Sequence, residues 1–425
     1  MKILLISYHF PPYNAVGAVR PGKLAKFLHQ RGHEVHVISA SRQPFATGLP
    51  LEIPAKHVVY ANGWSANAPV QWLLGGRKRV ARHGYLGSGR SWLRRLGCWY
   101  KTLLHWPDAE VGWAGAALAD GQRRLAEGGF GLIYVSAPPF SALRVGARLS
   151  RENGIPWVAE FRDLWSDNHA YAHPAWRRAI ERHWEERLLR TAAALVTVSP
   201  PLARTLERFG KPVWEVRNGF DPDDLRDLPP PLVTDTDTLQ IAYTGNVYPG
   251  HHDVDLFCEG LARLRAMGNR VRVQVAGRNI VPLLQAARTH GVEDWFDVRF
   301  TVARSEALSM QRAADVLLMF LWQGGEGGIY TTKLFEYAGA GRPILAVGPS
   351  GSDVAHWIGS ACVGACASTA ADVAALLAAW HQRKREAGVL VVEPAPGHDF
   401  TRQTQFAQLE VKLLALANDT REGCV

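Results

Sequence analysis

Apolar runs and amphipathic stretches alternate from the first residues of the chain. Lys2–Ser7 is a short apolar run followed by Pro11-Pro12, which predicts a buried strand and a loop. Arg20–Arg31 has the apolar spacing of a helix and stops at Gly32, and Val35–Ser39 is a second strand-like run. A strand, a helix and a strand in this order predict a parallel sheet with a right-handed crossover.

The same alternation continues towards the middle of the chain. We predict strands at Gly131–Ala137, Pro156–Phe161 and Ala194–Ser199, with helices over Phe140–Asn153 and Trp176–Thr191. These elements and the opening ones form one doubly wound α/β domain, which we expect over residues 1–220.

A composition change separates this domain from a second one. Residues 221–238 are rich in proline and acids and have little periodicity, which is typical of a linker. A second doubly wound domain is expected over 239–399, with strands at Leu239–Thr244, Val271–Ala276, Val298–Thr301, Val316–Leu321 and Pro343–Val347. Residues 400–425 contain an amphipathic helix that either closes the second domain or packs back on the first.

Composition narrows the class of protein. The 425 residues are 47% hydrophobic and 20% charged, which excludes collagen-like, disordered and coiled-coil proteins. The five cysteines are scattered, so we expect a reducing compartment and no disulfide framework. The N-terminal apolar run is too short for a signal peptide, and no run approaches the roughly 20 apolar residues of a membrane span. We therefore expect a cytoplasmic protein.

The net charge of +9 is concentrated in one segment, residues 53–107, which has nine lysines and arginines and no acid. Within it, Arg90–Trp106 has helical periodicity. Its apolar stripe is Trp92, Leu96, Trp99, Leu103 and Trp106, and opposite it lie Arg90, Arg94 and Lys101. This pattern favours a helix on an anionic membrane surface. The alternative is a helix packed on the first domain with a solvated basic face. Because the charge is local, nucleic acid is not an expected partner.

A glycine-rich loop, Gln323–Glu336 (QGGEGGIYTTKLFE), joins a predicted strand to a helix that begins near Lys333. A cation in the first turn opposes the helix dipole unless an anion such as a diphosphate binds there. Glu336, one turn later, is placed to accept hydrogen bonds from ribose hydroxyls. In the alternative, Thr332 is the N-cap, and Lys333 and Glu336 are ordinary surface residues.

Three other loops follow predicted strands. In Thr244–His252, Gly245 and Asn246 begin a turn suited to phosphate, and His251 and His252 either add hydrogen bonds or charge or are plain surface residues.

In Tyr13–Arg20, Gly17 allows close approach to a ligand. Arg20 is expected at a helix start, where it either binds an anion or is simply exposed. In Glu160–Asp163 (EFRD), Arg162 lies between two acids, so the alternatives are a functional cluster and an internal ion pair.

These residues resemble a known family, the retaining glycosyltransferases of family 4, over nearly the whole chain. The motifs that carry the resemblance are, in chain order, KILLISYHFPPYNAVGAVR, GIPWVAEFRDLW, ALVTVSPPLARTL, VRNGFDPDDL, IAYTGNV, AADVLLMF and TTKLFEYAGAGRPILAVG. The resemblance implies the GT-B fold, in which two Rossmann-like domains face each other across a cleft. The motifs PDAEVGW and APPFSALRVGARLSRENGIPW resemble a branch that assembles bacterial surface polysaccharides.

The resemblance also assigns roles to residues. Glu336 matches the second acid of the family's E-x7-E motif, which holds the donor ribose. Lys333 matches a basic residue that contacts diphosphate, and Gly17 matches a glycine that contacts phosphate or sugar.

Three positions depart from the family pattern. Gly328 stands where the first acid of E-x7-E is expected, and Glu326 is the candidate to replace it. Asn246 and His252 occupy positions where the family often has Arg and Lys, and Arg162 stands where many members have His.

The expected activity is retaining transfer of a sugar from a nucleotide diphosphate donor to a hydroxyl of an acceptor, a lipid-linked saccharide. Arg162, Lys333 and Glu326 are the candidate catalytic residues, and no metal or other cofactor is expected. The candidate acceptor and membrane residues are Arg90, Arg94, Lys101, Trp92 and Trp99. The protein is then expected at the inner face of the cytoplasmic membrane. The alternatives are a soluble natural-product acceptor, a non-catalytic polyanion-binding protein of the same fold and an inactive GT-B protein.

Overall fold

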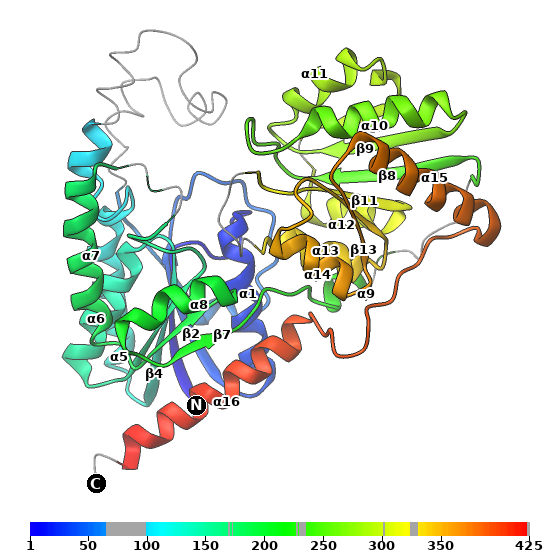
Figure 1. Cartoon of the computed structure of the whole chain (residues 1–425). Coiled ribbons are helices and arrows are strands. Elements are labelled where there is room, and N and C mark those ends of the chain that lie inside the picture. Colours follow the sequence, from blue (N-terminus) through cyan, green and yellow to red (C-terminus); the bar gives the residue numbers. More distant parts are fainter. Residues whose placement is uncertain are drawn as a thin grey trace. The chain divides into compact units, whose positions relative to one another are not determined.

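The computed structural model describes residues 1–64, 99–168, 171, 173–226, 228, 235–300, 302–323 and 330–422. The chain forms two compact units (Figure 1). Unit 1 comprises Met1–Arg217 together with Phe406–Val425, and unit 2 comprises Asn218–Gln405. The division after residue 217 lies just before the proline-rich stretch 221–238.

Unit 1 is built on a seven-stranded sheet in the order β3-β2-β1-β4-β5-β6-β7, in which every neighbouring pair is parallel. The strands are β1 (Lys2–Ser7), β2 (Glu34–Ala40), β3 (Val58–Ala61), β4 (Phe130–Ala137), β5 (Trp157–Phe161), β6 (Ala194–Thr197) and β7 (Val213–Glu215). The short strands β3 and β7 were not predicted. β3 lies in the basic segment 53–107, whose interpretation rested on charge rather than on strand periodicity, and β7 has only three residues.

Helices cover both faces of this sheet. They are α1 (Val16–Gln30), α5 (Ala114–Leu125), α6 (Ser141–Asn153), α7 (Ala175–Leu189), α8 (Pro200–Leu206) and α16 (Arg402–Glu422). Successive strand side chains alternate between the faces. Ile3 and Leu5 of β1 pack with α1 and α16, whereas Leu4 and Ile6 pack with α5 and α6. Phe406, Leu409 and Leu413 are the residues that α16 contributes to the core of unit 1.

Helix α1 begins earlier than predicted, at Val16 rather than Arg20, and contains Pro21. Proline has no N–H, so it cannot bond the carbonyl four residues before it. That carbonyl belongs to Gly17, and it accepts instead from the Arg162 guanidinium. The interior proline is therefore compatible with the helix, because a side chain from β5's end satisfies the freed carbonyl.

Unit 2 contains a six-stranded parallel sheet in the order β10-β9-β8-β11-β12-β13. Its strands are β8 (Thr238–Thr244), β9 (Arg270–Ala276), β10 (Phe296–Arg299), β11 (Val316–Phe320), β12 (Ile344–Val347) and β13 (Gly364–Ala367). β13 was not predicted, because its sequence GACA has no branched apolar residue.

The helices of unit 2 are α9 (Asp223–Arg226), α10 (Val254–Ala266), α11 (Val281–Thr289), α12 (Arg304–Ala313), α13 (Thr332–Ala340), α14 (Asp353–Ser360) and α15 (Ala370–Ala387). One face of the sheet packs against α10, α11 and α15, and the other against α13 and α14. Both units are thus doubly wound Rossmann-like α/β folds. Short 3-10 helices occur at Ala55–His57, Val111–Trp113, Glu207–Phe209 and Glu293–Trp295.

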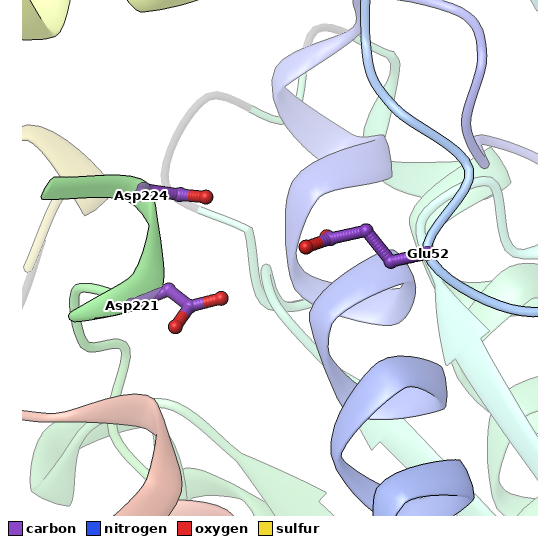
Figure 2. Close-up of side chains that lie close together, drawn as sticks. All are labelled: Glu52, Asp221 and Asp224. Carbon is purple, nitrogen blue, oxygen red and sulfur yellow. The ribbon is translucent and has the colours of Figure 1, made fainter. Parts of the chain in front are cut away.

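Figure 2 shows the side chains of three acidic residues, Glu52, Asp221 and Asp224. Each of them has a partner within its own unit. In unit 1, Glu52 forms ion pairs with two lysines of α1, Lys23 at 2.9 Å and Lys26 at 3.0 Å. In unit 2, Asp221 accepts from the side-chain amide of Gln403 at 2.9 Å. Asp224 of α9 pairs with an arginine of α12 at 3.3 Å. The stretch expected as a linker therefore contains a short helix bound to unit 2.

Candidate functional site

The sheet of unit 2 has its topological switch point at β8, whose neighbours β9 and β11 lead the chain away in opposite directions. Ligands of open α/β sheets bind at the carboxyl ends of the strands at such a point. Two predicted loops start there. Gly245–His252 follows β8, and the loop that leads into α13 follows β11. The structure thus brings Gly245, Asn246, His252 and Lys333 to one edge of unit 2.

Lys333 lies in the first turn of α13, with its ammonium 4.3 Å from the centre of the Tyr243 ring. Among the residues that the structure describes, the ammonium has no hydrogen bond or ion pair. Burial lowers the pKa of Lys333 to about 8, although Glu336 opposes this shift. A half-buried cation without a bonded anion creates a strong local preference for an anionic ligand.

The start of α13 adds to this preference. Thr331, not Thr332, is the N-cap, and its side chain makes no capping hydrogen bond. The first N–H groups of the helix therefore have no side-chain acceptor from the cap. Free N–H groups and the positive end of the helix dipole favour phosphate at the same place as Lys333.

Two glycines allow the β8 and β9 loops to meet. Gly245 has φ +143°, and a β-carbon at Gly277 would lie 1.9 Å from the Gly245 carbonyl oxygen. Asn246 follows, and its side-chain oxygen accepts from the backbone N–H of Arg278 at 3.2 Å. The Asn246 side chain is exposed, and its amide nitrogen has no partner among the described residues. It is available as a neutral donor where the family often has arginine.

His252 is half-buried, with its ring stacked on Phe320. Burial, Lys333 and His251 lower the pKa of His252 to about 4, so the ring is neutral near pH 7. Its Nδ1 accepts from the backbone N–H of Tyr248 at 3.4 Å. The expected cationic contribution is therefore absent in the ligand-free protein, and Nε2–H remains as a donor. Sequence reasoning missed Trp322 after β11, on which His251 stacks with ring centres 4.1 Å apart.

Glu336 lies on α13 and forms a partly buried ion pair with Arg304, the first residue of α12, at 2.6 Å. The second terminal nitrogen of Arg304 reaches Asp224 at 3.3 Å. Burial alone would lower the pKa of Arg304, but the two carboxylates outweigh it and raise that pKa. Sequence reasoning missed Arg304, because it lies far from Glu336 along the chain. Arg304 holds one oxygen of Glu336 and leaves the other for a ligand hydroxyl.

Glu326 and Gly328 lie outside the described residues. The substitution of Glu326 for the missing acid of E-x7-E therefore stays a prediction.

In unit 1 the switch point lies at β1, between β2 and β4. Arg162, just after β5, donates hydrogen bonds to three backbone carbonyls, those of Ala137, Pro138 and Gly17. It ties the end of β4 to the start of α1. A guanidinium has five N–H groups, so two of those of Arg162 have no acceptor among the described residues and are available to a ligand. A β-carbon at Gly17 would lie 2.6 Å from an Arg162 nitrogen, so a larger residue at this position would displace the guanidinium.

His9 is a candidate that sequence reasoning missed, although it lies only two residues after the end of β1. Its ring edge lies beside Gly17, where an added β-carbon would be 3.1 Å from His9 Cδ2. The amide nitrogen of Gln43 donates to two backbone carbonyls, so its oxygen accepts from His9 Nδ1–H at 3.0 Å. Burial lowers the pKa of His9 to about 4. His9 Nε2 is thus an unprotonated acceptor with no partner among the described residues.

Arg20 serves the interior of unit 1. It lies in the second turn of α1, is buried, and pairs with Glu160 at 2.8 Å. Tyr134 and Ser136 also donate to Glu160. The expectation of a helix-start anion site at Arg20 is therefore wrong. Glu160 of EFRD does form an internal ion pair, but its partner is Arg20, which lies outside the motif, and not Arg162.

The predicted membrane segment is described only in part, since Arg90, Trp92 and Arg94 lie outside the described residues. Residues 99–104 are helical, and Trp99 and Lys101 are exposed. Leu103 is 56% exposed, so in this part the predicted apolar stripe does not pack on unit 1. The predicted helix ends two residues before Trp106, which precedes Pro107 and turns towards α7.

Comparison with known proteins gives a family match for residues 22–224, which fit the model of Glycosyltransferase Family 4. No curated protein matched the chain in sequence.

Three solved structures are similar over nearly their whole length. HepE of Anabaena, solved with UDP and glucose, is 16% identical with a TM-score of 0.60, covering 98% of this chain and 100% of that one. Sucrose-phosphate synthase from Thermosynechococcus elongatus is 15% identical with a TM-score of 0.57, covering 98% and 99%. WaaG, a glycosyltransferase involved in lipopolysaccharide biosynthesis, is 14% identical with a TM-score of 0.54, covering 96% and 99%.

At these identities the structural likeness concerns the fold, and together with the family match it supports glycosyl transfer as the general activity. The resemblance read from the motifs is confirmed: residues 22–224 match Glycosyltransferase Family 4, and the chain as a whole has the GT-B fold of two Rossmann-like domains.

Proposed function

We propose that this protein is a retaining glycosyltransferase that moves a sugar from a nucleotide diphosphate donor to a hydroxyl of a lipid-linked saccharide in cell-surface polysaccharide assembly. One observation carries the donor part of the proposal: the Lys333 ammonium has no anion bonded to it among the described residues and lies at the uncapped start of α13, at the switch point of unit 2.

The donor fits this edge group by group. The diphosphate contacts Lys333 and the first N–H groups of α13, and the Asn246 amide adds a neutral donor. The ribose hydroxyls donate to the Glu336 oxygen that Arg304 leaves free. UDP is the first nucleotide to test, because HepE, a protein of the same fold, was solved with it.

Catalysis on this reading depends on charge stabilisation. As the bond between sugar and phosphate breaks, negative charge develops on the leaving diphosphate, and a preformed cation stabilises that charge without reorganisation. Lys333 and the helix start supply it, and no metal is invoked. In unit 1, the remaining N–H groups of Arg162 and the acceptor nitrogen of His9 are available to hydroxyl groups of the sugar or acceptor.

The acceptor class rests on two supports. Exposed Trp99 and Leu103 beside exposed Lys101 suit a lipid surface that presents the acceptor. WaaG, of the same fold, acts in lipopolysaccharide biosynthesis. No helix in the described ranges has the length and apolar composition to span a bilayer. The proposed location is therefore the inner face of the cytoplasmic membrane, held peripherally.

A thermal-shift screen with UDP, GDP, ADP and dTDP tests the donor site, because a ligand that binds the folded state raises the Tm. We expect one of the four to stabilise the wild type and not the Lys333→Ala variant. Transfer from the matching nucleotide sugar to a lipid-linked and to a water-soluble acceptor then tests the acceptor class. Stabilisation by none of the nucleotides, or equal stabilisation of the variant, would exclude the assigned site.

A further inference from the structure

Helix α7 has the reverse of the usual polarity. Its inward stripe consists of Arg177, Glu181, Glu185 and Leu189, all buried. Its outward stripe consists of Trp176, Ile180 and Trp184, which are 44%, 40% and 40% exposed. A helix on a globular domain normally turns its apolar stripe to the core. Figure 1 shows α7 at the outside of unit 1, and the three side chains of this stripe are not part of the hydrophobic core of the unit.

Interior hydrogen bonds fix the helix in this rotation. Arg177 pairs with Glu181 at 2.7 Å and donates to the Thr102 carbonyl at 2.8 Å. Glu181 also accepts from the Trp165 indole at 3.1 Å, and Glu185 accepts from Ser166. If α7 were rotated so that its tryptophans were buried, the charged side chains of Arg177, Glu181 and Glu185 would lose these partners. The exposure of the tryptophans is therefore built into the fold.

Trp106 extends the stripe from a different part of the chain. Its ring centre lies 6.2 Å from that of Trp176 and 5.1 Å from that of Trp184. The Arg177 guanidinium lies over the same ring at 4.8 Å and bonds the carbonyl of Lys101, so it holds the segment against α7. We call Trp106, Trp176, Ile180 and Trp184 the tryptophan face.

The exposed charges of α7 are mostly basic. Arg187 lies on the tryptophan stripe, one turn after Trp184, and Arg178 and Arg182 are also exposed, the latter paired with Asp167. Of the acids on the helix, Glu186 is half-exposed, and Glu181 and Glu185 are buried. Tryptophan and arginine on one exposed helix surface suit an interface with anionic lipid, where the ring lies among the headgroups and the cations meet phosphate. A second copy of the chain fits less well, because a two-fold contact would bring these arginines against each other.

We infer that the tryptophan face binds an anionic membrane surface and anchors unit 1 to it. The inference rests on the proposed function, since such a surface is where a lipid-linked acceptor is presented. It assigns the contact to α7, which lies outside the segment that the sequence pattern indicated, and to Trp106, the last residue of that segment.

The test uses the full-length protein and vesicles of phosphatidylcholine with and without phosphatidylglycerol. We expect the wild type to co-sediment with the anionic vesicles and to be released by high salt. The affinity of the triple variant Trp176→Ala/Ile180→Ser/Trp184→Ala for these vesicles should be lower by about tenfold or more. The matched control Met267→Ser/Val281→Ser removes exposed apolar side chains of unit 2 and should bind as the wild type does.

Charge reversal gives a second pair of variants that leaves the tryptophans in place. Arg187→Glu should weaken binding to anionic vesicles, and Arg288→Glu, an exposed arginine of α11, should not. The UDP-induced shift in Tm, measured on every variant, reports folding and the donor site separately from membrane binding. If the triple variant has lost this shift, the comparison of Arg187→Glu with Arg288→Glu decides.

Three results would overturn the inference. The first is a wild type that does not bind anionic vesicles. The second is a folded triple variant, or an Arg187→Glu variant, that binds them as the wild type does. The third is a wild-type dimer in sedimentation velocity that the triple variant abolishes, because a second copy would then occupy the face. A wild type that binds anionic vesicles but neither binds a nucleotide nor transfers a sugar would instead count against the proposed function.

Discussion

The ammonium of Lys333 occupies the space that a side chain at position 245 would fill. A β-carbon on Gly245 would lie 2.5 Å from Lys333 Nζ and 2.9 Å from its Cε. The glycine at the end of β8 therefore does more than allow a turn, because it creates the place in which the cation sits above Tyr243. The loop after β8 and the start of α13 therefore act together at the candidate site.

Gly245→Ala should weaken binding of the nucleotide diphosphate about tenfold or more, because the added methyl displaces Lys333 and the φ of +143° strains any residue but glycine. Titration calorimetry with the nucleotide found in the screen measures this. Gly351→Ala is the matched control, since no atom lies within 4 Å of its added β-carbon. Equal affinities in the two variants would show that the position of Lys333 does not depend on Gly245.

Lys333→Met should abolish diphosphate binding and yet stabilise the ligand-free protein. Burial lowers the pKa of Lys333 from 10.5 to about 8, so the folded state disfavours the charged form. The unfolded state binds more protons between these values, and wild-type stability should therefore rise with pH from about 8 to 10.5. The methionine variant should lack this rise and be more stable at pH 7 by on the order of 1–2 kcal/mol, allowing for solvent screening. Urea unfolding at several pH values measures both effects.

Lys333→Arg separates charge from pKa. In the wild type, affinity for the diphosphate should fall as the pH rises through about 8, because the free lysine then loses its proton. Arginine keeps its charge over this range, so the variant should show no such fall even if its affinity is lower. A decline of the same shape in both proteins would assign the pH dependence to another group.

Arg304→Gln should weaken UDP binding more than pyrophosphate binding, because Arg304 positions Glu336, the ribose acceptor, and does not touch the phosphates in this assignment. The matched control is Arg299→Gln, which removes a more exposed ion pair with Glu306. Parallel loss of both ligands in Arg304→Gln would indicate collapse of the α12–α13 contact rather than a role at the ribose.

Acid should destabilise the protein between pH 6.5 and about 4. Burial lowers the pKa values of His9, His105 and His252 from 6.5 to about 4. Over this interval the unfolded state binds protons that the folded state excludes, so stability falls as the pH falls. His9→Asn/His252→Asn should reduce the loss by on the order of 1 kcal/mol per histidine after screening. Urea midpoints between pH 7 and 4 measure this, with His183→Asn, an exposed position, as control. An unchanged slope in the double variant would contradict the prediction.

Much of the fold follows from apolar runs that are long enough to be recognised. The strand predicted at Lys2–Ser7 has the bounds of β1, and the one at Val271–Ala276 misses β9 by one residue. The strands that were missed, such as β7 and β13, are short and poor in branched residues. Their pairing depends on a neighbouring strand, and local sequence does not encode that neighbour.

The residues of the candidate site, too, could be predicted from the sequence only in part. Lys333 and Gly245 could be found because a cation at a helix start and a glycine after a strand are local signals. Arg304 could not, since its partner Glu336 is brought to it only by the packing of α12 on α13. The inverted polarity of α7 was equally hidden, because a helical wheel shows two stripes without saying which one the domain buries.

Unit 1 is closed by residues from the far end of the chain. Phe406, Leu409 and Leu413 of α16 share a core with Ile3 and Leu5 of β1. During synthesis, the first unit therefore leaves the ribosome with one face of its sheet lacking this cover, while the whole of unit 2 is made before the covering helix appears. Unit 1 is thus completed only after unit 2, although most of it is made first. A chain that lacks α16 leaves that apolar surface exposed to aggregation and proteolysis.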